Sequence, residues 1–73
     1  MKLSARNILH GTVTAIDRGQ VTGIVIIDIG GGNHITSSVT MAAIKDLKLK
    51  KGSKVAAIIK ASEVIIGVED HDR

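Results

Sequence analysis

Short runs of alternating apolar and polar residues dominate this chain and predict a small sheet protein. Residues 6–16 alternate, with Leu9, Val13 and Ala15 on the side that we expect to be buried. Residues 20–29 are rich in β-branched side chains and carry apolar residues on both faces. This pattern predicts a strand that packs in the core on one face and against a second subunit on the other.

The middle of the chain predicts a turn, a third strand and a short helix. Residues 30–33, three glycines and an Asn, are typical of a hairpin turn into a strand over residues 34–39. Thr40 then has the character of a helix N-cap, and apolar residues recur at helical spacing over 41–47. We therefore expect the helix to begin directly after the third strand.

Two further apolar runs predict a fourth strand over residues 54–60 and a fifth over residues 63–68. This spacing alone predicts an all-β fold, a small barrel of five strands with one short helix between strands 3 and 4. We place the domain over residues 1–69 and treat residues 70–73 as a charged tail.

The composition indicates a subunit that is stabilised by association. A domain of 73 residues buries only about 60% of the surface of its unfolded chain, so an isolated copy is marginally stable. There is no Cys for a disulfide or a thiolate metal site, and the core must form without Phe, Trp or Tyr. Yet 44% of the residues are apolar, which predicts that aliphatic surface is buried between copies. The chain has no signal-like or membrane-spanning run, so we expect a cytoplasmic location.

The charged residues argue against an enzyme and leave one alternative open. Acidic residues and three histidines are scattered without the spacing of a catalytic pair, so no catalytic activity is expected. Five lysines lie within the ten positions 45–54 and belong either to a solvated surface or to a nucleic-acid footprint. OB domains that bind single strands rely on aromatic platforms, and this chain has none. A nucleic-acid-binding OB-fold module is therefore the alternative interpretation.

Two segments that join a cation to small hydrogen-bonding residues predict an oxyanion site. They are Ser4-Ala5-Arg6-Asn7, where the first strand begins, and Lys60-Ala61-Ser62, where the fourth strand ends. Guanidinium, ammonium, hydroxyl and backbone N–H groups are the donors with which a tetrahedral dianion can replace its water. Thr40 adds a hydroxyl at a predicted helix start. Taken singly, these residues are better explained by structural roles, Arg6 by a surface ion pair, Lys60 by a strand end and Thr40 by a plain helix cap.

Together with Gly30-Gly31-Gly32-Asn33 and Ile35-Thr36-Ser37, these segments resemble the molbindin family over roughly residues 2 to 68. Molbindins are small molybdate-binding proteins built from a single TOBE (transport-associated OB) domain of the Mop type. The resemblance implies the five-stranded OB-like barrel and reversible binding of molybdate, and of tungstate, for intracellular storage. It also implies a homohexamer, arranged as a trimer of dimers, with molybdate at the subunit interfaces and a second kind of oxyanion site on the symmetry axes.

The resemblance further implies which residues hold molybdate, and that two chains contribute them. One chain would provide the two cationic segments, and the other would provide the start of the short helix. Position 43 departs from the family pattern, because related domains often have Ser where this chain has Ala. The implied set is Ser4, Ala5, Arg6, Lys60 and Ala61 from one chain, with Thr40 and Ala43 from the other.

Overall fold

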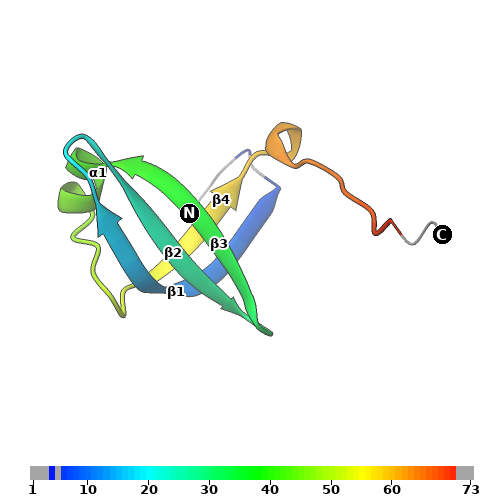
Figure 1. The fold of residues 1–73 in the computed structure, drawn as a ribbon, viewed down its shortest axis with the longest axis horizontal. Coiled ribbons are helices and arrows are strands. Elements are labelled where there is room, and N and C mark those ends of the chain that lie inside the picture. Colours follow the sequence, from blue (N-terminus) through cyan, green and yellow to red (C-terminus); the bar gives the residue numbers. More distant parts are fainter. Residues whose placement is uncertain (1–3, 5, 71–73) are drawn as a thin grey trace.

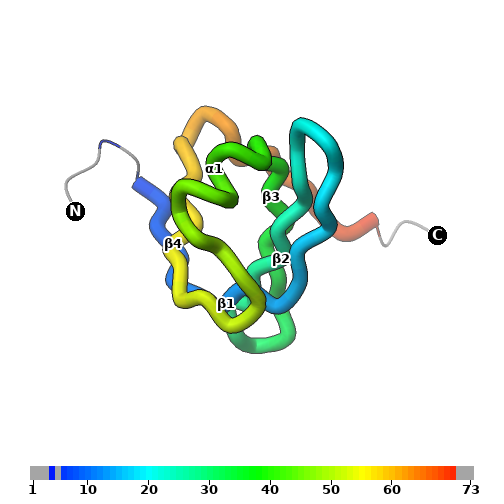
Figure 2. The backbone as a smooth tube through the Cα atoms, turned by 90° about the vertical axis from the view of Figure 1, so that its left-hand side faces the viewer, coloured from blue at the N-terminus to red at the C-terminus, as the bar shows by residue number. Residues whose placement is uncertain are grey.

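A computed structural model describes Ser4 and residues 6–70, which form a curled antiparallel sheet with one short helix (Figure 1). Within these residues the sheet has four strands in the order β3-β2-β1-β4, so β3 and β4 are its two edges. Seen from the end, the strands curve around a common axis, and α1 lies across one end of the half-barrel (Figure 2). The elements are β1 (Asn7–Arg18), β2 (Thr22–Gly30), β3 (Asn33–Thr40), α1 (Met41–Asp46), β4 (Lys54–Ile59) and the 3-10 turn η1 (Ala61–Glu63).

The glycine run forms the hairpin between β2 and β3 that the sequence predicts. Gly30, Gly31 and Gly32 have φ values of 94°, 63° and 80°, a region that residues with a Cβ rarely adopt. The Asp28 carboxylate accepts a hydrogen bond of 2.8 Å from the backbone N–H of Gly30. The turn therefore combines three glycines at positive φ with one side chain, Asp28, that binds the backbone where the turn begins.

The predicted helix is confirmed between the third and fourth strands, and it supplies one side chain to the core. Ile44 of α1 is 1% exposed and packs with Val13, Val25, Ile27 and Ala57. The helix approaches the sheet closely because β2 has a glycine there, Gly23. A Cβ on Gly23 would lie 2.7 Å from the Cδ1 of Ile44. Burial of a few aliphatic side chains, without any aromatic ring, thus forms the whole core of the described residues.

The strict alternation expected along the first strand is wrong after Val13. The pairing of β1 with β2 shifts between Val13, opposite Ile27, and Ala15, opposite Ile26. This β-bulge moves Ala15 to the exposed face and turns Ile16 toward the core. One extra residue reverses the inward positions for the rest of the strand, which an alternation pattern does not reveal.

The fifth strand expected over residues 63–68 is also not confirmed. Glu63 belongs to η1, and residues 64–70 are extended without strand pairing. They run away from the half-barrel (Figure 1), so their apolar side chains are exposed: Ile65 by 93%, Ile66 by 82% and Val68 by 89%. The reason is geometric, because η1 directs residues 64–68 away from both sheet edges, so this stretch forms no strand pair with the other described residues. The described part of a single chain is therefore an open, four-stranded half-barrel.

The open side of the half-barrel is an apolar groove of about 420 Å³ between the two edge strands. Ile35 and Val39 line it from β3, and Val55, Ala57 and Ile59 line it from β4. In a closed OB barrel this space is filled by a further strand.

Among the described residues, no helix is long and apolar enough to cross a membrane.

Candidate functional site

Arg6 and Lys60 lie at the same end of the sheet. Asn7 and Ile59 are paired at that end of the β1–β4 ladder, and the two cations are the next residue on each side. The side-chain amide of Asn7 donates a 3.1 Å hydrogen bond to the carbonyl of Ile59. Lys60 keeps the extended conformation of the strand, with φ −63° and ψ 139°, before the chain turns. The structure thus brings the two predicted cations together.

The small residues predicted beside these cations lie at the same end where they are described. Ser4 and Ala61 are exposed, as are both cations, whereas Ala5 lies outside the described residues. The turn η1 is closed by N–H groups of Glu63 and Val64, which donate to the carbonyls of Lys60 and Ala61 over 2.9 and 3.2 Å. Those two carbonyls therefore point into the turn.

Thr40 and Ala43 form the N-terminal cap of α1. The N–H of Ala43 donates to the Thr40 hydroxyl oxygen over 3.0 Å, and the N–H of Met41 donates to the Val21 carbonyl over 2.7 Å. Both amides are thus engaged within the chain. A hydroxyl that accepts one hydrogen bond still has its own proton to donate, so the Thr40 O–H remains a donor for a ligand.

The two groups of predicted site residues lie at opposite ends of the sheet. Thr40 pairs with Thr22 at the start of β2, next to the end of β1, where Arg18 pairs with Gly23. Arg6 precedes the other end of this 12-residue strand, and residues in a strand rise about 3.3 Å each. In Figure 1, α1 and η1 accordingly lie far apart. One chain does not bring Arg6 and Thr40 together.

The chemistry of both groups suits an anion rather than a metal cation. The described residues contain no group of three or more His, Asp or Glu side chains that could hold a metal ion.

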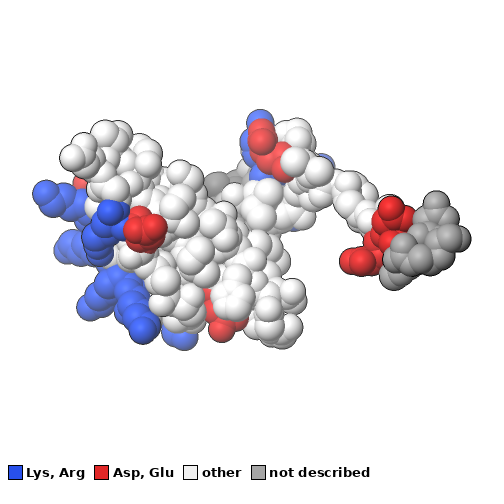
Figure 3. Space-filling model, viewed as in Figure 1, with Lys and Arg blue, Asp and Glu red and all other residues white. Residues whose placement is uncertain are grey.

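Positive charge gathers at the end of the molecule that carries α1 (Figure 3). We refer to this surface as the basic end, formed by Arg18, Lys45, Lys48, Lys50 and Lys51 around two adjoining hollows.

Sequence reasoning found Arg6 and Lys60 but missed two residues, Asn7 beside them and Arg18 at the opposite end of the sheet. Asn7 is a neighbour of the predicted site that fixes the strand ends through its side chain, and its position inside the Ser-Ala-Arg-Asn segment was the available signal. Arg18 joins the lysines of the basic end, which required the fold, because it is distant from them in sequence.

Comparison of the chain with known proteins identifies its family. A family model described as the TOBE domain matches residues 3–66. A probable molybdenum-pterin-binding protein of Haemophilus influenzae is 55% identical over 69 residues, which cover 94% of this chain and all of that protein.

Solved structures show the same fold. MopII of Clostridium pasteurianum in an apo form has a TM-score of 0.86 at 37% identity, over 92% of this chain and all of that one. A molybdate-bound structure of the cytoplasmic molybdate-binding protein ModG has a TM-score of 0.90 at 51% identity. That match covers 94% of this chain and 49% of the ModG chain.

Proposed function

The chain belongs to the TOBE domain family, in its molbindin (Mop) group, and on this premise we propose that it binds molybdate reversibly at an interface between copies. The observation that carries the proposal is the placement of Arg6 and Lys60 side by side at one end of the β1–β4 pair. The relatives described above support molybdate as the ligand by their printed descriptions.

The proposed mechanism is an exchange of hydration for protein donors. Arg6 and Lys60 compensate the two negative charges, and the hydroxyls of Ser4 and Thr40 donate hydrogen bonds. Each charge-assisted bond contributes about 1.5–3 kcal/mol, and more in an interface that excludes water. Ala5, Ala61 and Ala43 are small residues that allow the backbone to approach the anion. Binding of this kind needs no covalent or redox step, and we propose no enzymatic activity.

The location of the two groups supports a site shared between copies. Arg6 and Lys60 lie at one end of the sheet and Thr40 at the other, so a complete site needs a second chain. Exposed apolar surface supports association between copies. Residues 64–68 and the groove between β3 and β4 are both uncovered in the single chain. The proposed assembly is a homohexamer, arranged as a trimer of dimers.

The proposed role is storage and buffering of molybdate, and of tungstate, in the cytoplasm. The molybdate-bound relative is itself described as a cytoplasmic molybdate-binding protein. The alternative of a nucleic-acid-binding OB module has less support, because the chain has no aromatic residue on which a base could stack.

The experiment that tests the proposal is a calorimetric titration with molybdate, tungstate, sulfate and phosphate, with the oligomer mass measured in the same buffer. We expect tight binding of molybdate and tungstate. Sulfate should bind poorly, because donors placed for the larger anion leave a smaller tetrahedron partly unpaired. Equal responses to all four anions would reduce the site to a generic anion site. Salt-sensitive binding of an oligonucleotide without any molybdate response would favour the alternative.

A further inference from the structure

The two hollows of the basic end adjoin but have different linings. The larger, of about 620 Å³, has an apolar floor that includes Met41, Ala42 and Leu49. The smaller, of about 380 Å³, lies against the last turns of β1, and Arg18 and Lys50 line both hollows. No Asp or Glu of the described residues lines either one. An apolar hollow that continues into a cationic one suits a ligand with an apolar body and an anionic part.

Lys48, on the rim of the larger hollow, has a backbone conformation that favours glycine. Its φ of 53° is the one positive value among the non-glycine residues that the structure describes. The N–H of Lys48 donates to the Lys45 carbonyl over 3.0 Å, and the N–H of Leu49 donates to the Ile44 carbonyl over the same distance. This pair of bonds is the Schellman motif at the end of α1, whose left-handed residue is usually glycine. A lysine is strained in this position, and such strain is found most often where it serves a binding site.

The loop over residues 49–53 is fixed on β1 by its backbone. The N–H of Val13 donates to the Ser53 carbonyl over 2.9 Å, and the carbonyl of Val13 accepts from the Gly52 N–H over 2.8 Å. The Ser53 hydroxyl in turn accepts from the Lys50 N–H over 3.0 Å. Because the backbone is already held, only the lysine side chains need to be ordered when an anion binds, which lowers the cost of binding.

We propose that the basic end binds a planar heterocycle that carries a chain of phosphates, as in a nucleoside triphosphate. The ring lies on the apolar floor of the larger hollow, and the phosphates extend past Arg18 and Lys50 into the smaller one, which Lys51 also lines. A chain of phosphates fits better than a single anion, because cations line both hollows. None of the described residues that we propose for molybdate lines either hollow. The inference therefore goes beyond the proposed function and does not rest on it.

Calorimetric titration of the full chain with adenosine triphosphate (ATP) tests the site. The buffer contains little salt and no divalent cation, since a bound cation would neutralise the phosphates. Parallel titrations use tripolyphosphate, which lacks the ring, and adenosine, which lacks the phosphates. We expect ATP to bind about tenfold more tightly than tripolyphosphate, because the ring buries apolar surface, and adenosine to give no measurable heat. No binding of ATP would overturn the site, and equal affinities of ATP and tripolyphosphate would overturn the place of the ring.

A glycine at position 48 separates ligand binding from stability. Lys48→Gly should weaken ATP binding about tenfold, because a cation at the phosphates is lost. The same change should leave the melting temperature unchanged or raise it, because glycine adopts the left-handed conformation without strain. Arg18→Gln should weaken ATP binding to a similar extent without a change at this turn.

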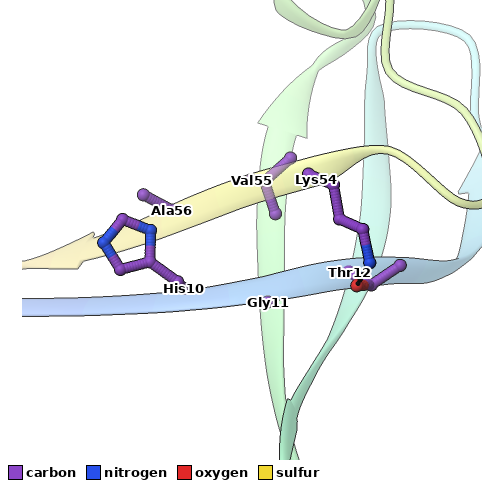
Figure 4. A pocket seen from close by; sticks show the side chains of 6 residues that line it. All are labelled: His10, Gly11, Thr12, Lys54, Val55 and Ala56. Atoms are coloured by element: carbon purple, nitrogen blue, oxygen red, sulfur yellow. Dashed lines mark hydrogen bonds between the residues drawn. The ribbon is translucent and has the colours of Figure 1, made fainter.

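The matched control is Lys54→Ala, which removes the same charge outside the basic end. Lys54 lines a different hollow, where its Nζ donates a 3.0 Å hydrogen bond to the Thr12 hydroxyl (Figure 4). This variant should bind ATP like the wild type. Wild-type ATP affinity in both Lys48→Gly and Arg18→Gln, or an equal loss in Lys54→Ala, would overturn the proposal.

Discussion

Asn7 and Ile59 are joined in two ways, as a pair of the β1–β4 ladder and by a 3.1 Å hydrogen bond from the Asn7 side-chain amide to the Ile59 carbonyl. These two contacts fix the point at which β1 begins and β4 ends. Arg6 and Lys60 follow directly on either side, so the two cations converge through backbone pairing although 53 other residues separate them in sequence.

Removal of either converging cation should weaken molybdate binding severely while the fold remains intact. Arg6→Ala and Lys60→Ala are each expected to cost roughly 2–5 kcal/mol of binding free energy, because the bound dianion loses a compensating charge. Both residues are exposed and lie outside the core. Calorimetric titration measures the loss.

The matched control for these variants is Lys54→Ala, which removes an exposed lysine at the other end of β4 from Lys60 and outside the basic end, and which should bind like the wild type. Wild-type affinity in both Arg6→Ala and Lys60→Ala would show that the site is wrongly placed. Loss of the fold in either variant would point to a structural role for that cation.

Thr40→Val should have two effects that can be measured separately. Without molybdate, loss of the cap to the Ala43 N–H should lower the free energy of unfolding by about 0.5–2 kcal/mol. With molybdate, the ligand should stabilise the oligomer against dilution less than it stabilises the wild type, because a donor hydroxyl is missing. Thr40→Ser keeps the hydroxyl and should behave like the wild type in both measurements. A full molybdate response in Thr40→Val would exclude Thr40 from the site.

Gly11→Ala should destabilise the sheet, because β1 and β2 approach each other closely at this position. A Cβ on Gly11 would clash with the backbone carbonyl of Asp28 and lie 2.7 Å from the Cγ2 of Ile27. Such overpacking typically costs about 1–3 kcal/mol, which should lower the melting temperature by at least about 4 °C. An unchanged melting temperature in Gly11→Ala would contradict the close approach.

Local patterns predicted the elements that depend on local chemistry. The glycine run predicted the turn because positive φ values favour glycine, and Thr40 predicted the helix start because its hydroxyl caps the Ala43 N–H. The bulge after Val13 was not predictable from alternation, since the extra residue is defined by its pairing with β2. The fifth strand failed for a related reason: an apolar run over 63–68 indicates a segment that needs cover, but not which chain provides it.

In the candidate site, too, residue types could be predicted from the sequence, whereas the contacts between residues could not. Arg6 and Lys60 were predicted from their residue types, and the fold adds the hydrogen bond of Asn7 that holds them together. The resemblance to molbindins implied that this chain lacks a hydroxyl at Ala43, and the structure adds that the Ala43 N–H is engaged by Thr40.

The most direct test of the central claim is complementation between chains. Arg6→Ala and Thr40→Val each remove one half of every interface site in their own oligomers, so neither alone should bind molybdate tightly. After the two proteins are refolded together, an interface that receives Arg6 from one variant and Thr40 from the other is intact. Random mixing should restore wild-type affinity at about a quarter of the sites, measured by calorimetric titration of the mixed oligomer. Mixed oligomers that form but bind no better than either variant alone would contradict a site shared between copies.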